Sequence, residues 1–254
     1  MRQVLLPPGL GPGSLYLAKG KDFHYLSRVL RLKKGARLQG RDPCGQAFSL
    51  ILEKAEQNCL TFKVEALLGE ESSQQDLELI LYCCLPKPIK MDLIVRMVAE
   101  IGVKRIVPVV SEYSVIKAKD LAGLRLRQKR WEAIARAALE QSGRKEMLVL
   151  EEPVLLQDLP PAGPVNEELA VFGYERPSDC AALHSLLAGN LPQRIRALVG
   201  PEGGLSQPEV ARLKELGFKA VNLGPNILRS ETAAVFICAA ISVLVMEKGT
   251  WRIN

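Results

Sequence analysis

Residues 198–209 read LVGPEGGLSQPE and join an apolar strand to a helix through a glycine-rich turn. The preceding residues, Arg194–Val199, favour a strand, and Ser206 with Glu209 three positions later has the pattern of a helix N-cap and capping box. Glycines at a strand end permit positive φ and close approach of a ligand to the backbone. The spacing differs from the GxGxxG dinucleotide motif. The stretch therefore predicts a strand–turn–helix unit whose turn is either an ordinary tight turn or a ligand loop.

A second turn of this kind follows the next expected strand, where residues 223–233 read LGPNILRSETA. Ser230 is expected to cap the apolar helix that follows. Arg229 stands at the mouth of the turn, and an unpaired arginine is costly to bury. Arg229 is therefore expected either to pair with a neighbour such as Glu202 or Glu231, or to face a ligand.

Strand-like and helix-like patterns alternate from residue 76 onward, which predicts an α/β fold with a parallel sheet covered by helices on both faces. Ligands of such sheets bind at the carboxyl ends of the strands, where both glycine-rich turns lie. The expected strands are 77–85, 105–110, 169–172, 194–199 and 220–223. The expected helices are 90–101, 125–140, 178–187, 207–216 and 231–246.

The first 67 residues instead predict short strands at 14–17, 36–39, 46–52 and 60–67. One helix is expected at Asp22–Leu32, where apolar residues repeat at helical spacing. This pattern fits a small RNA-binding β-barrel. The polar residues 69–75 read as a linker, so the expected domains are 1–72 and 73–254.

The net charge of +6 and the pI near 9.0 favour a polyanionic partner, although mild basicity is also common in other soluble proteins. Residues 19–41 carry eight basic side chains against one acid, Asp22, and the run 117–130 contains a single acid, Asp120. Charge segregated in this way predicts two basic surface patches, unless each is simply a solvated face.

The six cysteines include no CxxC pair, and the chain has only two histidines, His24 and His184. Reduced thiols are typical of the cytoplasm, and this residue set makes a zinc site or a Ser/His/Asp triad improbable. No signal-peptide pattern is present at the N-terminus, and the apolar run 233–246 reads as too short to span a bilayer. Because residues 233–241 are apolar on every face, that helix is expected to be buried all round.

Taken together, the two turns closely resemble the signature of the RsmE family of the SPOUT superfamily. Further segments resemble the family in the same order along the chain: HYLSRVLR at 24–31, PK at 86–87, AEIGV at 99–103 and ALEQSGR at 138–144. Two positions depart from the family pattern. Asn226 stands where an arginine is common, and Met97 stands where a lysine often precedes the ELGV element, so RNA contacts there must come from other residues.

The resemblance implies a PUA-like β-barrel followed by a SPOUT domain with a C-terminal trefoil knot. It also implies a cytoplasmic homodimer, without a metal, that uses S-adenosylmethionine to methylate uridine N3 in 16S rRNA, either as naked RNA or in an assembled small subunit. The cofactor-binding residues that it implies are Phe172, Gly173, Val199, Gly200, Glu202, Gly203, Gly204, Leu223, Gly224, Ile227, Leu228, Arg229 and Thr232.

The implied reaction removes a weakly acidic proton from N3, so the enzyme must accept that proton or stabilise the anion. Arg229 is the expected stabilising group, and Glu202 or Glu231 is expected to orient Arg229, to relay the proton or to act only structurally. The expected RNA-binding residues are His24, Arg28, Arg31, Lys87, Lys90, Glu140, Gln141 and Arg144. Because Arg28 and Arg31 are three apart in the expected helix, they are expected to share a face.

Three other functions remain open from the sequence. The first is a SPOUT enzyme that methylates another base or a ribose 2′-hydroxyl. The second is a non-catalytic rRNA-binding assembly factor. The third is a dinucleotide-dependent oxidoreductase, which shares the α/β pattern but lacks the phosphate-binding fingerprint.

Overall fold

The computed structural model describes residues 3–42, 45–67, 77–116, 121–144 and 146–248. The chain divides into two compact units, the first made of Met1–Gln74 with Leu139–Glu146, and the second made of Gln75–Ala138 with Met147–Asn254. The expected linker lies outside the described residues. The sequence does not predict that residues 139–146 belong with the first unit.

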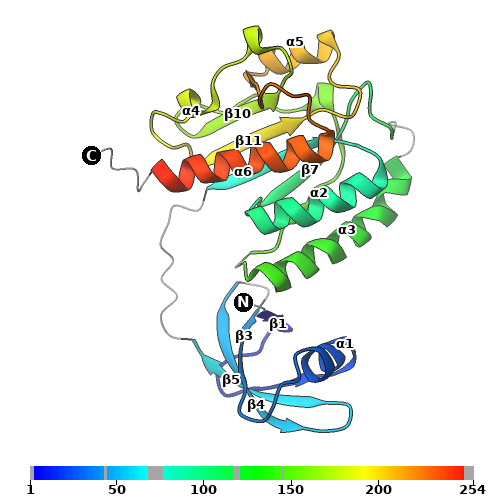
Figure 1. The fold of residues 1–254 in the computed structure, drawn as a ribbon, viewed down its shortest axis with the longest axis vertical. Coiled ribbons are helices and arrows are strands. Elements are labelled where there is room, and N and C mark those ends of the chain that lie inside the picture. Colours follow the sequence, from blue (N-terminus) through cyan, green and yellow to red (C-terminus); the bar gives the residue numbers. More distant parts are fainter. Residues whose placement is uncertain (1–2, 43–44, 68–76, 117–120, 145, 249–254) are drawn as a thin grey trace. The chain divides into compact units, whose positions relative to one another are not determined.

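A five-stranded sheet forms the first unit, in the order β1-β3-β4-β5-β2 (Figure 1). β1 pairs in parallel with β3, and the other pairs are antiparallel. Alternate residues of β4 and β5 are buried, as in a sheet with one face on a core. The four expected strands are confirmed with small shifts at their ends, and the very short β1 is an addition. The strands are β1 (Gln3–Leu5), β2 (Leu15–Ala18), β3 (Arg37–Arg41), β4 (Ala47–Ala55) and β5 (Leu60–Ala66).

The expected helix Asp22–Leu32 is wrong in form. α1 (Gly20–His24) continues into a π-helix, η1 (Tyr25–Val29), and Arg31 beyond it has φ 52°. A π-helix has a wider turn than an α-helix, and a residue with left-handed backbone ends a helix. Arg28 and Arg31 therefore do not share an α-helical face, which corrects the expectation drawn from their spacing.

A chain of buried polar side chains lies between the strands of the first unit and residues 139–144 at the end of α3 (Leu121–Ser142), which belong to the same unit. Gln3 Nε2 donates to the carbonyl oxygens of Leu139 (3.1 Å) and Arg144 (2.7 Å), and Arg41 Nε donates to Gln3 Oε1 (3.1 Å). Arg41 is only 2% exposed. It is therefore part of the interior and does not belong to the exposed basic patch predicted for residues 19–41.

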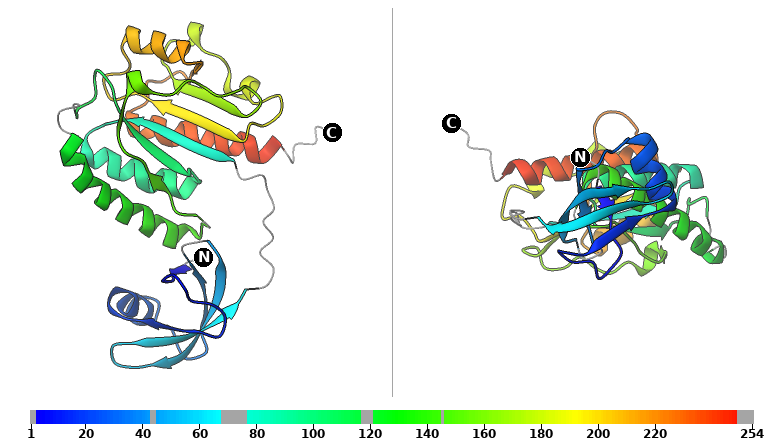
Figure 2. Two further views of the ribbon diagram at one scale, coloured as in Figure 1. Left: turned by 180° about the vertical axis from the view of Figure 1, so that it is seen from behind. Right: turned by 90° about the horizontal axis from the view of Figure 1, so that it is seen from below.

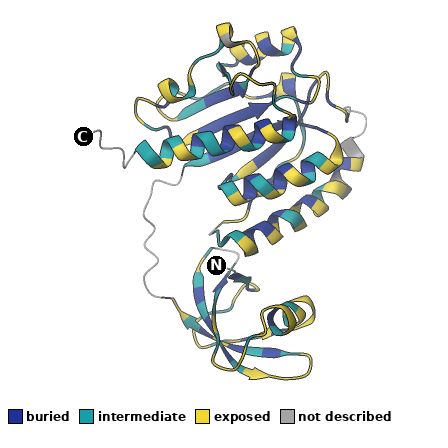
Figure 3. Cartoon of the chain, viewed as in Figure 1, coloured by how far each residue is buried: buried dark blue, intermediate teal, exposed yellow. Residues whose placement is uncertain are grey.

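The second unit is built on a parallel sheet in the order β12-β10-β11-β6-β7-β8, with β9 also paired to β7, which confirms the α/β prediction. Its central strands are buried, as Figure 3 shows. The expected strands 105–110 and 194–199 are reproduced at both ends. The strands are β6 (Glu78–Cys84), β7 (Arg105–Val110), β8 (Val149–Leu150), β9 (Val154–Leu155), β10 (Glu168–Gly173), β11 (Arg194–Val199) and β12 (Lys219–Val221).

Helices cover both faces of this sheet, as two views from opposite sides show (Figures 1 and 2). α2 (Pro88–Ile101), α3 and α6 (Ser230–Lys248) contribute to one apolar core. α5 (Gln207–Glu215) and the short 3-10 helix η3 (Leu156–Asp158) contribute to the core on the other face. The sheet is thus sandwiched, and its carboxyl edge is left for a site.

The expected helix 178–187 is wrong over most of its length. The structure has a 3-10 turn, η4 (Pro177–Asp179), and a short α4 (Leu183–Leu186) instead. Between them Ala181 forms a parallel bridge with Val221, and its N–H donates to Ala220 O at 2.8 Å. Pairing with the sheet edge satisfies the backbone there and overrides the local helical tendency.

α6 is longer than the apolar run suggested, and by length and composition it could cross a membrane, with a mean hydropathy of 1.7. A core helix of a soluble protein meets the same criterion. Ala234, Ile237 and Ile241 are fully buried against the sheet, but Phe236 and Met246 are 48% and 55% exposed. The prediction that this helix is buried all round is therefore wrong for the single chain, because the fold supplies a partner layer on only one side.

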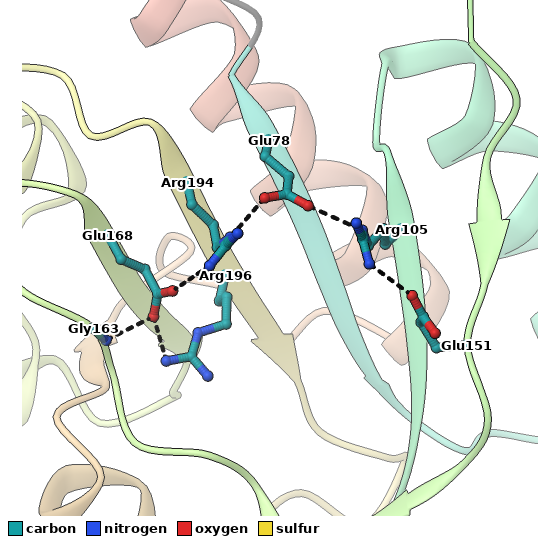
Figure 4. Close-up of polar contacts among 7 residues, drawn as sticks. All are labelled: Glu78, Arg105, Glu151, Gly163, Glu168, Arg194 and Arg196. Carbon is teal, nitrogen blue, oxygen red and sulfur yellow. Dashed lines mark hydrogen bonds and ion pairs between the residues drawn. The ribbon is translucent and has the colours of Figure 1, made fainter. Parts of the chain in front are cut away.

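An ion-pair ladder crosses the amino ends of the central strands (Figure 4). Arg105 binds Glu151 at 3.0 Å and Glu78 at 2.9 Å, and the second oxygen of Glu78 binds Arg194 Nε at 2.6 Å. Arg194 also reaches Glu168 at 3.5 Å. These contacts join neighbouring strands at the edge opposite the glycine-rich turns, so the ladder supports the sheet and takes no part in the site.

Candidate active site

A cavity of about 270 Å³ opens at the carboxyl ends of β10, β11 and β12. Both glycine-rich turns contribute to its walls, as the sequence predicts for a ligand loop at a strand end. The segment after β10 forms the third wall. The lining residues are Gly173, Tyr174, Glu175, Val199, Gly200, Pro201, Glu202, Gly203, Gly204, Leu205, Asn222, Leu223, Gly224, Pro225, Asn226, Ile227, Leu228, Ser230 and Ala233.

The first turn depends on two glycines for different reasons. Gly204 has φ 74°, and its N–H donates to Pro201 O at 3.0 Å, so a side chain there would be strained. Gly203 faces Tyr113, and a Cβ at that position would come within 3.0 Å of Tyr113 Cβ. Ser206 is the N-cap of α5, and its N–H donates to Glu209 Oε2 at 2.9 Å, which confirms the predicted helix start.

Asn222 joins two walls of the cavity. Its Nδ2 donates to Tyr174 O at 3.3 Å, and its Oδ1 accepts from the N–H of Gly224 at 3.0 Å. Tyr174 N also donates to Val221 O at 2.9 Å. The sequence reasoning missed Asn222, although its position directly before the Leu-Gly turn is a signal that could have found it.

A charged triad lies beside the cavity in the second unit. Lys90 Nζ, in the first turn of α2, is 3.1 Å from Glu202 Oε1 and 3.1 Å from Glu231 Oε2. Ser230 Oγ donates to Glu231 at 3.2 Å. Among the residues that the structure describes, these carboxylates form ion pairs with Lys90 and with no arginine.

The triad shifts the ionisation of all three members. A hydrogen bond to Glu231, with a further one to Glu202, raises the pKa of Lys90 above its usual value. Burial alone would raise the pKa of each glutamate, but hydrogen bonds from its own backbone amide and from Lys90 outweigh burial and hold the pKa below its usual value. Both glutamates are therefore ionised near neutral pH and are weak proton acceptors.

Arg229 is exposed and directly precedes α6, where its carbonyl accepts from Ala233 N at 2.8 Å. Its guanidinium pairs with neither Glu202 nor Glu231, so the prediction that it pairs with one of them is wrong. Lys90 engages both carboxylates instead. Arg229 is exposed, so its guanidinium is solvated and the cost of burying an unpaired arginine does not arise. Ser230 is the first residue of α6 and therefore lies one position after the N-cap that the sequence predicted it to be.

Three of the expected cofactor residues do not line the cavity. Phe172 is fully buried in the sheet core, Arg229 is exposed beside the turn, and Thr232 is exposed on the first turn of α6. Ile227 lines the cavity but is 88% exposed, whereas Leu223 and Leu228 are half-buried. In the second turn, the apolar wall therefore comes from the two leucines more than from Ile227.

The expected RNA-binding residues are divided between the units. His24, Arg28 and Arg31 are exposed in the first unit, which also contains Glu140, Gln141 and Arg144. Lys87 and Lys90 belong to the second unit, where Lys87 N–H donates to Glu202 Oε1 at 3.4 Å. Burial lowers the pKa of Arg144, and the charge of Glu146 opposes the shift. Residues 117–120 of the second predicted basic patch lie outside the described residues.

The sequence model of the RNA methyltransferase domain family matches residues 73–242. Ribosomal RNA small subunit methyltransferase E of Aquifex aeolicus is 36% identical over 89% of this chain and 93% of its own length. The Bacillus subtilis protein of the same name is 30% identical over 88% of both chains. This chain belongs to that family. This is the family that the sequence motifs resemble, so that prediction is confirmed. Its members are RNA methyltransferases, so the alternative of a dinucleotide-dependent oxidoreductase is wrong.

A solved member of the family has the same fold. Ribosomal RNA small subunit methyltransferase E from Neisseria gonorrhoeae, solved bound to S-adenosyl methionine, is 28% identical to this chain. The match covers 96% of this chain and 98% of that one, with a TM-score of 0.76. The family fold therefore extends over both units of the chain.

Proposed function

We propose that this protein transfers the methyl group of S-adenosylmethionine to N3 of a uridine in small-subunit ribosomal RNA. The observation that carries the proposal is the cavity built from both glycine-rich turns in a member of this family. Relatives over nearly the whole chain are named as ribosomal RNA small subunit methyltransferases, and one is bound to the cofactor.

The lining residues fit S-adenosylmethionine in both chemistry and position. Leu205, Leu223 and Leu228 offer apolar surface for an adenine ring, while Gly173 and Gly200 leave the backbone accessible at two strand ends. We assign the cofactor contacts to the predicted residues that line this cavity. Phe172 supports them from beneath, and Arg229 and Thr232 stand at the rim.

Arg229 has the catalytic role in this proposal. When bound, the cofactor supplies a sulfonium methyl group that N3 of uracil takes as the N3 proton is lost to solvent. The guanidinium of Arg229, which has no ion-pair partner among the described residues, stabilises the negative charge that develops on the uracil. Glu202 and Glu231 are held ionised with lowered pKa, so neither serves as the proton acceptor, and they organise the site through Lys90.

We further propose that the first unit is a PUA-like barrel that binds RNA, with domains at 1–72 and 73–254. The exposed Arg28 and Arg31 and the exposed Lys33 and Lys34 supply phosphate contacts there. In the second domain, the segment after β12 forms the trefoil knot. The hydrogen bonds from Asn222 to Tyr174 and from Tyr174 to Val221, which join that segment to the one after β10, support this assignment.

We propose that the working form is a cytoplasmic homodimer. The outer face of α6 supports this, because Phe236, Val243 and Met246 are 48%, 43% and 55% exposed on an otherwise packed helix. Large exposed apolar side chains gathered on one helix are typical of protein interfaces.

The test is methyl transfer followed by product analysis. The purified protein is incubated with methyl-labelled S-adenosylmethionine and small ribosomal subunits that lack the modification, and the rRNA is digested to nucleosides. Label in N3-methyluridine is expected. Label in a ribose-methylated nucleoside or in another base would overturn the base assignment, and cofactor binding without any transfer would favour an assembly factor.

A further inference from the structure

Lys90 occupies an unusual position for a residue expected to bind RNA. It lies in the first turn of α2, and its ammonium group is 3.1 Å from one carboxylate in the glycine-rich turn and 3.1 Å from another in the first turn of α6. The two carboxylates come from two of the three segments that wall the cavity. A single cation therefore joins three elements at the edge of the proposed cofactor site.

The triad is partly shielded from solvent, with side-chain exposures of 22% for Lys90, 28% for Glu202 and 15% for Glu231. Charges at this depth interact more strongly than fully solvated pairs. Glu202 also accepts from the backbone N–H of Lys87, which fixes the carboxylate to the start of α2. Two of the three N–H donors of Lys90 thus have carboxylate partners, and the two negative charges oppose the approach of a phosphate.

The same cluster bears on Arg229, two residues before Glu231. With Lys90 in place, both glutamates have a cation, and Arg229 has no partner among the described residues. Without Lys90, two ionised carboxylates would be left near the cavity with no counter-charge. Arg229 is the cation that its own segment offers them, and an arginine captured in this way is no longer available to the substrate.

We infer that Lys90 is a positioning residue: it ties the glycine-rich turn to the start of α6 and, by engaging Glu202 and Glu231, keeps Arg229 free for the uracil. The inference rests on the proposed function, because it assigns Arg229 to the substrate. It replaces the RNA contact that the sequence predicts for Lys90.

The experiment compares Lys90→Met and Lys90→Arg with Lys219→Met, a matched control at an exposed lysine that begins β12. Cofactor affinity is measured by calorimetry, and kcat and KM for the small subunit are measured by methyl transfer. We expect Lys90→Met to weaken cofactor binding about tenfold and to lower kcat by at least as much. This is roughly the effect of losing one partly shielded ion pair. Lys90→Arg and the control should stay within about threefold of wild type.

The KM for the ribosomal subunit distinguishes a positioning role of Lys90 from a direct contact with RNA. A positioning residue leaves this KM and its salt dependence unchanged, so a Lys90→Met variant with unchanged cofactor affinity, a raised subunit KM and a weaker salt dependence would overturn the inference in favour of an RNA contact. Thermal unfolding of each variant by circular dichroism identifies any that fail to fold. If Lys90→Met fails to fold, Glu231→Gln provides the same test, because Glu231 binds Lys90 but does not line the cavity; weakened cofactor binding is expected, and unchanged binding is the contrary result.

Removing a carboxylate as well gives the sharpest check. In the Lys90→Met background, Glu231→Gln leaves one fewer uncompensated charge to capture Arg229, so part of the lost kcat should return. If the losses of kcat caused by Lys90→Met and Glu231→Gln simply add in the double variant, the inference is overturned. A wild-type protein without methyl transfer would contradict the proposed function, whereas an active wild type with unaffected Lys90 variants would contradict only the role of Lys90.

Discussion

Replacing Arg196, which pairs with Glu168 at one end of the ion-pair ladder, with methionine should destabilise the second unit more than removing any single charge of the ladder itself. Arg196 is 3% exposed, and its guanidinium lies 5.8 Å from the ring centroid of Tyr82 and 5.0 Å from that of Phe218. It forms an ion pair with Glu168 and donates to Pro160 O at 3.0 Å and Pro161 O at 2.7 Å (Figure 4 shows the pair).

The magnitude follows from what the substitution leaves behind. Methionine keeps apolar contact with the two rings, but the Glu168 carboxylate loses its buried partner and both carbonyls lose their donor. Breaking a buried pair from one side costs about 3–5 kcal/mol. For a unit of this size, that corresponds to a fall in melting temperature of about 10 °C.

Thermal and urea unfolding followed by circular dichroism measure the effect. Adding Glu168→Gln to Arg196→Met removes the stranded charge and should recover part of the loss, because the two side chains interact directly. A loss of less than about 1 kcal/mol, the size of a surface pair, would refute the reasoning. A double variant in which the two losses simply add would refute it as well.

Three further predictions concern other parts of the molecule. Glu168→Gln should cost stability at neutral pH and progressively less as the pH falls. Burial would raise the pKa of Glu168, but the hydrogen bond from Gly163 and the charge of Arg196 hold that pKa below its usual value. The ionised group therefore stabilises fully above its unfolded pKa, about 4.3, and loses this contribution as the pH falls through its lower folded pKa; a stability difference that stays constant in denaturant titrations at several pH values would contradict this. Burial raises the pKa of Cys83 and of Cys238 to about 12, so alkylation at pH 8 with peptide mapping should leave both unmodified in the native protein, and rapid labelling of either would contradict their burial. Phe236→Glu should convert the proposed dimer to a monomer in sedimentation velocity, and an unchanged dimer would show that α6 lies outside the interface.

Local patterns predicted much of the fold. Strands 105–110 and 194–199 were predictable because each is a short, largely apolar segment rich in β-forming residues. The helix start at Ser206 followed from its capping box with Glu209. The family motifs predicted which turns line the cavity.

The features that the sequence predicted wrongly depend on contacts between distant segments of the chain. Ala181 joins the sheet edge beside Val221, so a helix-like stretch is broken by a partner that its own sequence does not reveal. The pairing of Glu202 and Glu231 with Lys90, rather than with Arg229, depends on how α2 approaches both turns. Periodicity also cannot foresee that Arg28 lies in a π-helix and that Arg31, beyond the end of that helix, has a left-handed backbone.

The most direct test of the account compares wild type with Arg229→Ala in the nucleoside assay, alongside the cofactor dissociation constant of each. Wild type should place label in N3-methyluridine, and Arg229→Ala should bind the cofactor nearly as well while turnover falls by about a hundredfold or more, since a single electrostatic stabiliser contributes that much to a transition state. An Arg229→Ala variant that methylates N3 at close to the wild-type rate would contradict the central role given to this arginine.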